Sequence, residues 1–332
     1  MKIVVQKYGG TSVNTKERRL NIIKNAKDAI KEGLSPVIVV SAMGRKPEAY
    51  ATDSLFSLLP DLDGISMRSK DLLGTCGEII TTVIVSEELR LSGLKSIPLT
   101  GGQAGIMTDG TFGEGEIVNI DTARIKSLIS DDVVPIVAGF QGISKDNEIT
   151  TLGRGGSDIT ATALGAALDA ELVEIYTDVD GVYTTDPRIT EKAYMLEDIS
   201  FADVLNMAEF GAKVIHPRAV KFAMDKEVPT AVLNVNKDRT TSHTSISAKK
   251  TDNFNAVACL ENVNEEKTES KITVLGNRIC SESNISQKIT DLLKAEGIEV
   301  IGIKEDADYI SVCVLNERAK DSVRVLHDAL IG

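Results

Sequence analysis

The sequence comprises 332 residues, with 37 Lys and Arg against 49 Asp and Glu, which gives a formal net charge of −12. An apolar share of 42% and a charged share of 26% are ordinary for a soluble globular protein and exclude disordered and collagen-like chains. The acidic balance argues against non-specific binding to nucleic acid or to anionic membranes, because both attract positive charge. At about 150 residues per domain, the length predicts two domains.

Neither the first residues nor the cysteine pattern indicates export. The apolar run Ile3–Val5 is too short for a signal-peptide core, and no stretch approaches the roughly 20 apolar residues that cross a bilayer. The cysteines, Cys76, Cys259, Cys280 and Cys313, lack the paired spacing of a zinc site or a disulfide framework. We therefore expect a cytoplasmic protein whose cysteines are small apolar fillers.

Short runs rich in Val and Ile alternate with glycine-rich turns and helical stretches over the first 240 residues. The runs are KIVVQKYGG, SPVIVVSAMG, KSIPLTGG, DVVPIVAGFQG, LVEIYTDVDG and VPTAVLNV. Continuous apolar runs are typical of parallel strands that are buried on both faces by helices. Residues 1–240 are therefore predicted to form an α/β domain with a mostly parallel sheet sandwiched by helices.

Two helices of this domain can be outlined from the sequence. Residues 15–33 are predicted to be helical and to end at Gly33. The stripe of this helix that is expected to face the core consists of Leu20, Ile23, Ala26 and Ile30. Residues 157–170 form a second predicted helix, rich in small residues and capped by Ser157 and Asp158.

The C-terminal part has a different pattern. Residues 236–253 are rich in Thr, Ser and Lys without apolar periodicity, and are predicted to be a connector. Residues 254–332 then follow the order strand, strand, helix, strand, strand, helix. The predicted strands are NAVACLEN, KITVLGN, EVIGIKED and DYISVCVL. This order predicts a small α+β module.

Gly9 and Gly10 follow the first predicted strand and precede the first helix. Such glycines let the backbone approach a ligand, and amides at a helix start suit a phosphate, which Lys7 could also reach. The segment matches neither the P-loop nor the dinucleotide fingerprint. A tight turn and a ligand site therefore both stay open here.

A second glycine cluster surrounds an arginine. Arg154 is flanked by Gly153, Gly155 and Gly156 at the start of a predicted helix. Glycines forfeit side-chain contacts, so the cluster has little packing value, whereas backbone donors, a guanidinium fork and a positive helix end suit an anion. We favour an anion site over a plain loop.

Further charged residues follow the next strand. Asp178 and Asp180 lie where α/β sheets place ligands and could bind a ribose or a cation, although an Asp-rich turn is the simpler interpretation. Arg188 and Lys213 are further cations in an acidic chain, and each alone is best interpreted as a solvated surface charge.

Taken together, these segments resemble the aspartate kinases of the amino-acid kinase superfamily. The matching motifs are KYGGTSV at 7–13, VVSAMGR at 39–45, TCGE at 75–78, TGGQAGIMTD at 100–109, GFQG at 139–142, TLGRGGSD at 151–158, TDVDGVYTTDPR at 177–188 and MAEFGAKVIHPR at 207–218. The C-terminal module resembles the ACT regulatory unit of this family. Relatives usually carry two such units, one inserted in the other, whereas residues 254–332 have room for one, which puts the usual feedback site in doubt.

The resemblance implies transfer of the γ-phosphoryl group of ATP to the side-chain carboxylate of L-aspartate, the first step toward lysine, threonine and methionine. A carboxylate is already ionised at neutral pH, so this nucleophile needs no general base. The barrier lies in bringing anions together, which calls for cations and amide dipoles. The implied cofactors are ATP and Mg²⁺, with no closed metal site in the protein. A homodimer through the ACT-like module is expected.

The same resemblance implies a role for each motif residue. Lys7 and Asp158 are the expected catalytic residues. The expected nucleotide-binding residues are Lys7, Tyr8, Gly9, Gly10, Ser41, Gly44, Thr177, Asp178, Tyr183, Arg188, Lys213 and Val214. The expected aspartate-binding residues are Thr52, Glu78, Arg154, Gly155, Gly156 and Ser157. Glu78 would pair with the ammonium group of aspartate, and Arg154 with its α-carboxylate.

Two alternatives stay open at this point. The chain could be a superfamily kinase for another carboxylate acceptor, or a non-catalytic protein that senses an amino acid through its ACT-like module. Glu78 together with Arg154 favours a free amino acid over an N-acylated one. The joint presence of Lys7, Arg154, Asp158 and Lys213 favours catalysis over sensing.

Overall fold

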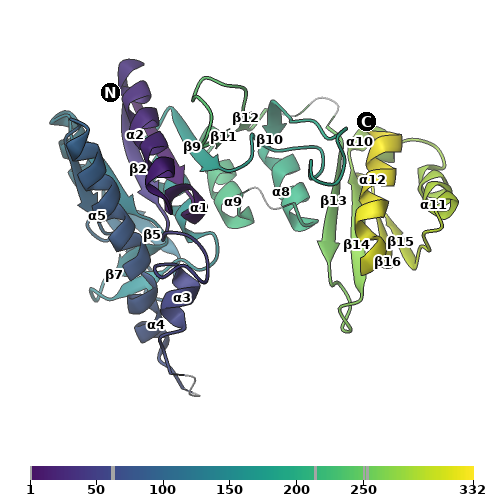
Figure 1. The fold of residues 1–332 in the computed structure, drawn as a ribbon, viewed down its shortest axis with the longest axis horizontal. Coiled ribbons are helices and arrows are strands. Elements are labelled where there is room, and N and C mark those ends of the chain that lie inside the picture. The colour runs from purple at the N-terminus through teal and green to yellow at the C-terminus, as the bar shows by residue number, and fades with distance from the viewer. Residues whose placement is uncertain (1, 61–63, 213–214, 250, 252–253) are drawn as a thin grey trace. The chain divides into compact units, whose positions relative to one another are not determined.

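The computed structural model describes residues 2–60, 64–212, 215–249, 251 and 254–332, and the chain divides into two compact units (Figure 1). The first unit comprises residues 1–180 and 218–243, and the second comprises residues 181–217 and 244–332. Residues 181–217 thus group with the C-terminal residues. The expected boundary, with a catalytic domain over 1–240 and an ACT-like domain over 254–332, stays a prediction.

A parallel sheet forms the centre of the first unit, as the sequence predicts. Within this unit its strand order is β11-β9-β1-β2-β6-β3, and every pair for which the register is given is parallel. The strands are β1 (Lys2–Tyr8), β2 (Leu34–Val40), β3 (Ser96–Leu99), β6 (Val134–Ala138), β9 (Leu172–Thr177) and β11 (Thr230–Asn234). Each arises from one of the six apolar runs, because a strand covered on both faces gains most from continuous Val and Ile.

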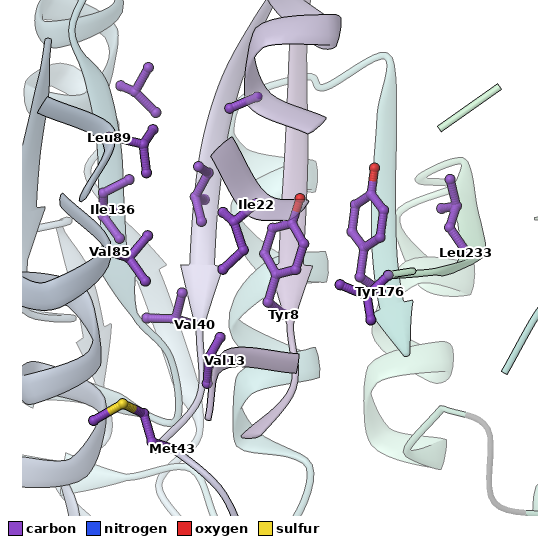
Figure 2. Close-up of a cluster of buried hydrophobic side chains, with 14 of the residues drawn as sticks. Tyr8, Val13, Ile22, Val40, Met43, Val85, Leu89, Ile136, Tyr176 and Leu233 are labelled. Carbon is purple, nitrogen blue, oxygen red and sulfur yellow. The ribbon is translucent and has the colours of Figure 1, made fainter. Parts of the chain in front are cut away.

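Helices cover both faces of this sheet. One face packs against α1 (Gly10–Val13), α2 (Lys16–Lys31) and α5 (Cys76–Leu91) through the cluster in Figure 2, where the ring of Tyr8 stacks on Tyr176 at 4.6 Å between centroids. Helix α7 (Gly156–Ala167) packs on the opposite face, since Gly165 lies directly against Val173 of β9. Neighbouring strand residues alternate between faces, so Lys7 lies on the α7 face while Tyr8 lies on the other.

The helix predicted over residues 15–33 is α2, but its buried stripe differs from the prediction. Leu20 and Ile30 are 54% and 41% exposed. The buried residues are Ile22, Asn25, Ala26 and Ala29. The small alanine side chains let α2 lie close to the sheet, which leaves the two longer side chains outside the contact.

The second predicted helix has a different start. Helix α7 begins at Gly156, and its N-cap is Gly155 with φ 73°, a left-handed conformation that only glycine adopts without strain. No side chain caps this helix, so the prediction that Ser157 and Asp158 are caps is wrong. Both residues lie inside the first turn, which leaves the carboxylate of Asp158 free for another contact.

Several elements of the first unit were not foreseen. They are α1, α5, α3 (Thr52–Phe56), α4 (Met67–Gly74), α6 (Ala123–Ser130), α9 (Pro217–Asp225) and a small sheet of order β5-β4-β7-β8, formed by β4 (Ile106–Thr108), β5 (Ile117–Ile120), β7 (Gln141–Ser144) and β8 (Ile149–Thr151). These strands have three or four residues each, too few to give a periodic pattern.

The second unit contains β10 (Asp198–Ser200), which pairs in parallel with β12 (Thr244–Ser247), and helix α8 (Phe201–Glu209). Strand β12 falls inside the predicted connector, so that part of the prediction is wrong. The side chain of Thr244 is fully buried and accepts a hydrogen bond from the Val182 amide at 2.8 Å. A buried threonine looks the same in sequence as a loop threonine, which explains the miss.

The remaining elements confirm the predicted order of strands and helices. They are β13 (Ala256–Glu261), β14 (Glu269–Leu275), α10 (Asn277–Cys280), α11 (Ile285–Ala295), β15 (Gly302–Glu305), β16 (Tyr309–Leu315), η1 (Asn316–Arg318) and α12 (Ala319–Leu330). The sheet order is β13-β14-β16-β15, and all pairs are antiparallel. Counted from β14, this is a ferredoxin-like β-α-β-β-α unit, and β13 occupies the edge that a last strand would take. Residues 256–330 therefore supply all four strands and the helices of this unit, with β13 in the place of the last strand.

None of the helices that the structure describes combines the length and the apolar composition that crossing a membrane requires.

Candidate active site

A cavity of about 600 Å³ lies in the first unit, next to the ends of β1 and β2 and the start of α7. Carboxyl ends of neighbouring parallel strands meet at one edge of a sheet, which brings distant motifs together here. Of the predicted site residues, the lining contains Lys7, Gly10, Ser41, Gly44, Thr52, Glu78, Arg154, Gly155, Gly156, Ser157 and Asp158. Gly153 of the second glycine cluster also lines it. The lining is completed by residues to which the sequence assigned no role, namely Ala42, Asp53, Phe56, Met67, Lys70, Asp71, Gly113, Glu114, Phe140 and Thr151.

Lys7 and Asp158 form an ion pair in this lining. The Lys7 Nζ atom lies 2.5 Å from Asp158 Oδ1, and the two side chains are 12% and 14% exposed. The face alternation of β1 directs Lys7 toward α7, and the uncapped first turn of α7 presents Asp158 to it. The pair holds the ammonium group of Lys7 in place while leaving it accessible from the cavity.

Glu78, in the first turn of α5, is a buried acid with an incomplete set of partners. It is 3% exposed, and its Oε1 accepts a hydrogen bond from the Ala42 amide at 3.0 Å. Its Oε2 is buried and accepts none from the described residues. Burial raises the pKa of Glu78 to about 8, although amide hydrogen bonds from Ala42 and Glu78 lower it. The site is thus suited to a ligand that brings a positive charge.

Arg154 lies on the turn between β8 and α7, and its side chain is exposed at the cavity. Among the described residues it has no hydrogen bond or ion pair. The turn itself is held firmly, because Arg218 Nη1 donates to the Leu152 carbonyl at 2.7 Å and the Leu152 amide donates to the Phe140 carbonyl at 2.9 Å. A fixed backbone with an unpaired guanidinium suits recognition of a carboxylate.

Gly10 lies where two backbone segments approach closely. A Cβ at this position would lie 2.7 Å from the carbonyl oxygens of both Ala42 and Gly44, a distance that side chains do not tolerate. The Gly44 amide also donates to the Gly10 carbonyl at 2.9 Å. The first glycine cluster is therefore a close contact between the β1–α1 and β2–α3 connections, and it forms one wall of the cavity.

Other predicted residues lie outside the lining. The ring of Tyr8 is fully buried in the core, whereas Gly9 adjoins Lys7, since a Cβ on Gly9 would lie 3.5 Å from the Lys7 Nζ atom. Thr177 ends β9 in the first unit, and its hydroxyl donates to Asp178 Oδ1 of the next residue at 3.2 Å.

Two of the predicted nucleotide residues, Tyr183 and Arg188, belong to the second unit. Tyr183 bridges to Met195, and Arg188 forms an ion pair of 2.6 Å with Asp186. Lys213 and Val214 lie outside the described residues.

Asp71 is the cavity residue that the sequence analysis missed most clearly. It lies in α4, is 2% exposed, and accepts hydrogen bonds from the loop at Gly113 and from Thr151 at the end of β8. Its only signal was an acidic residue four positions before the TCGE motif, and polar residues on helices are usually solvated.

No group of three or more His, Cys, Asp or Glu side chains that could hold a metal ion occurs in the described part of the chain. The described side chains therefore do not suit a metal that is bound by the protein alone. They do suit a cation that is held mainly by the oxygens and waters of a bound phosphate compound.

Comparison with known proteins leads to one family. The profile of the amino acid kinase family matches residues 2–234. Aspartokinase 1 of Bacillus subtilis (strain 168) is 39% identical over 336 residues, covering 99% of this chain and 81% of that protein. The aspartokinase of Bacillus sp. (strain MGA3) is 33% identical over 404 residues, covering 99% and 97% respectively. E. coli aspartokinase III, solved in complex with aspartate and ADP, has a similar fold, with a TM-score of 0.81, 21% identity and full coverage of both chains.

The second of these alignments also measures what this chain lacks. Its 404 positions exceed the 332 residues of this chain by 72, so at least 72 positions of that relative have no counterpart here.

Proposed function

This chain belongs to the amino acid kinase family and, within it, to the aspartokinases, and from that premise we propose that it phosphorylates the side-chain carboxylate of L-aspartate with ATP. A carboxylate oxygen attacks the γ-phosphorus, the bond from that phosphorus to the bridging oxygen breaks, and ADP leaves with the electron pair. The observation that carries the proposal is the meeting of Glu78, Arg154 and Lys7 in one cavity. Together they offer an acceptor for an ammonium group, a donor for a carboxylate and a cation for a phosphate.

Aspartate is held at both of its α-substituents in this proposal. Glu78 pairs with the ammonium group, which supplies the partner that its Oε2 lacks. Arg154 takes the α-carboxylate, and Thr52 and Ser157 line the same cavity. Because the side-chain carboxylate is ionised at neutral pH, no residue has to remove a proton from it.

The transferring phosphoryl group needs positive charge, and Lys7 is placed to supply it. Gly9 and Gly10 let the backbone approach the phosphates, and Ser41 and Gly44 line the same wall. Asp158 keeps Lys7 oriented through the 2.5 Å ion pair. Stabilising the charge on the phosphoryl oxygens, rather than acid–base chemistry, is then the main contribution of these residues.

The remaining nucleotide contacts are assigned by family membership. They are Tyr8 through its backbone, Thr177, Asp178, Tyr183, Arg188, Lys213 and Val214. Mg²⁺ is proposed to arrive on the ATP oxygens with waters still bound, with Asp158 as the carboxylate beside the phosphates, and it neutralises part of their charge. We further propose a cytoplasmic enzyme that dimerises through the β13–β16 sheet, where β15 is an exposed edge strand.

An assay of ADP release tests this function. The purified chain is given ATP and Mg²⁺ with L-aspartate, L-glutamate, N-acetyl-L-glutamate or UMP as acceptor, and hydroxylamine traps an acyl phosphate product as the hydroxamate. We expect turnover with aspartate well above that with the other acceptors. Aspartate binding without ADP release would instead favour the non-catalytic sensor, and turnover with another acid would favour a different acceptor.

A further inference from the structure

We propose that Asp71 is a positioning residue, which holds the Arg154 turn in the conformation that binds the α-carboxylate of the substrate. The inference rests on the proposed function for the identity of that substrate. Asp71 projects from α4 into the cavity wall and is 2% exposed. Among the described residues no Lys, Arg or His pairs with it, so its surroundings must stabilise it in another way.

Three hydrogen bonds take the place of a cation. Asp71 Oδ2 accepts from the amides of Gly113 and Thr151, both at 2.9 Å, and Oδ1 accepts from the Thr151 hydroxyl at 2.9 Å. These donors replace the water that a buried carboxylate loses. Removing the carboxylate would leave the buried donors without an acceptor, which costs free energy of folding. Both oxygens are therefore engaged with the protein, and a negative group would repel the carboxylates of aspartate. Asp71 is suited to hold loops rather than substrate.

The two segments that Asp71 joins, the loop of residues 113–115 and the end of β8, also touch each other. The Gly115 amide donates to the Thr151 carbonyl at 2.8 Å, and a Cβ on Gly153 would lie 3.2 Å from the Gly113 carbonyl oxygen. Gly113 and Gly153 both line the cavity. Asp71 thus fastens the loop of residues 113–115 and the end of β8 to one helix.

Arg154 needs such an anchor because of its neighbours. Gly153 and Gly155 have φ values of 72° and 73°, and glycines leave a backbone with many accessible conformations. The fixed point before them is made by Thr151, bound to Asp71, and by Leu152, bound to Arg218. Loss of the Asp71 contact would let the guanidinium move by the ångström or so that weakens a two-point contact with a carboxylate.

The chain offers a matched control in Asp109. This exposed residue accepts the same kinds of hydrogen bond, from the amides of Thr111 and Glu116 and from the Thr111 hydroxyl, and it belongs to the loop that leads to Gly113. It does not line the cavity or touch the β8 end. Comparing Asp71→Ala with Asp109→Ala therefore separates a weakened loop from a misplaced Arg154.

The experiment measures kcat, both KM values and amide hydrogen exchange for wild type, Asp71→Ala, Asp71→Asn and Asp109→Ala. For Asp71→Ala we expect the KM for aspartate to rise about tenfold or more, with the KM for ATP within about twofold. Exchange should accelerate at Gly113 and at residues 151–156. Asp71→Asn should recover most of the loss, since its amide oxygen can accept the two N–H groups and its NH2 can donate to Thr151.

Three outcomes would overturn the inference. They are an equal rise of both KM values, the same change in Asp109→Ala, and unchanged exchange at residues 151–156. If Asp71→Ala does not fold, Asp71→Asn carries the same tests with a smaller expected change. Amide exchange is measured without substrate, so it tests the anchoring role independently of the reaction. If the wild type fails to phosphorylate aspartate but Asp71→Ala still exchanges faster at residues 151–156, the proposed function is contradicted while Asp71 remains the anchor of the turn.

Discussion

Two glutamates of the first unit are buried to nearly the same degree but have opposite surroundings. Glu174 on β9 is 1% exposed and accepts hydrogen bonds at both oxygens, from Arg239 at 2.6 Å, from Gln6 at 2.9 Å and from the Tyr176 hydroxyl at 3.0 Å. Glu78 is 3% exposed and accepts hydrogen bonds from the amides of Ala42 and Glu78, while its Oε2 has no partner among the described residues.

The difference separates a structural acid from one kept ready for a ligand. A buried charge is tolerated when partners compensate it, as Arg239 does for Glu174 while also pairing with Glu32. A buried acid that has neither a cation nor donors for both of its oxygens destabilises the folded protein and is typical of a binding or catalytic site. Burial alone would have placed the two residues in one class, whereas the count of donors around each carboxylate divides them.

The largest effect should come from breaking the compensated site. Arg239→Ala leaves Glu174 buried without its cation, and breaking a buried pair in this way costs about 3–5 kcal/mol. We expect a loss of that order in the free energy of unfolding, measured by urea denaturation. Arg90→Ala is the control, because Arg90 pairs with Glu87 at 2.7 Å with 59% of its side chain exposed. A similar loss in both variants would show that burial of the pair is unimportant.

Substitution of Glu78 is expected to increase the free energy of unfolding, whereas substitution of Arg239 decreases it. The raised pKa means that the folded state binds a proton more tightly than the unfolded one, so wild-type stability falls as pH rises from about 4.5 through about 8. Glu78→Gln removes this penalty and should raise the unfolding free energy at pH 9 by several kcal/mol, since each pKa unit between about 4.5 and about 8 corresponds to about 1.4 kcal/mol, with little change at pH 5. Thermal unfolding at both pH values measures it.

The same variant should lose substrate affinity. Without a carboxylate for the ammonium group, the KM for aspartate should rise about tenfold to a hundredfold. Glu87→Gln is the matched control, because Glu87 lies on the exposed side of the same helix. A Glu78→Gln enzyme with an unchanged KM for aspartate would remove Glu78 from the binding site.

The sequence predicted the parts of the site that repeat a strand-then-glycine pattern. Lys7 and Gly10 lie at the end of β1, which arises from an apolar run, and their place beside the end of β2 follows from the parallel sheet. Arg154 follows β8, a strand too short to give a periodic pattern, so its glycine neighbours and not the strand order marked it as a site residue. Asp71 was missed because its contacts reach loops 42 and 80 residues away in the chain, and no local pattern records such a contact. Glu78 was identified through the family resemblance. Nothing in its local sequence shows that its Oε2 lacks a hydrogen-bond donor, which only the structure reveals.

Core placement was harder to predict than element order. The buried stripe of α2 depends on which side chains are short enough to lie against β2, and β12 depends on the burial of Thr244. The buried face of α2 and the burial of β12 both depend on the surface against which each element packs, and the element's own sequence carries no information about that surface. The order of the four strands and the two longer helices of the C-terminal module needed only local periodicity and was predicted, whereas the short α10 and η1 were not.

Affinity for aspartate should depend on pH in a defined window. Glu78 has to be ionised to pair with an ammonium group, and a pKa of about 8 leaves it mostly protonated at pH 6. Below that pKa, each pH unit should change the KM for aspartate about tenfold, so the KM should fall about tenfold from pH 6 to pH 7. Initial rates over pH 6–9 measure this, with Glu78→Gln expected to give a much flatter profile.

The smallest and most direct signal is the proton itself. If aspartate binds the ionised form of Glu78, binding at pH 6.5 has to release about one proton per site, because the free protein holds it there. Titration calorimetry in two buffers of different ionisation enthalpy, without ATP, gives this number from the difference in apparent heat. Glu78→Gln, if it still binds at high aspartate concentration, should release none. Binding to wild type without proton release would mean that Glu78 stays neutral in the complex, and the contrast with Glu174 would then reflect packing rather than readiness for a charged ligand.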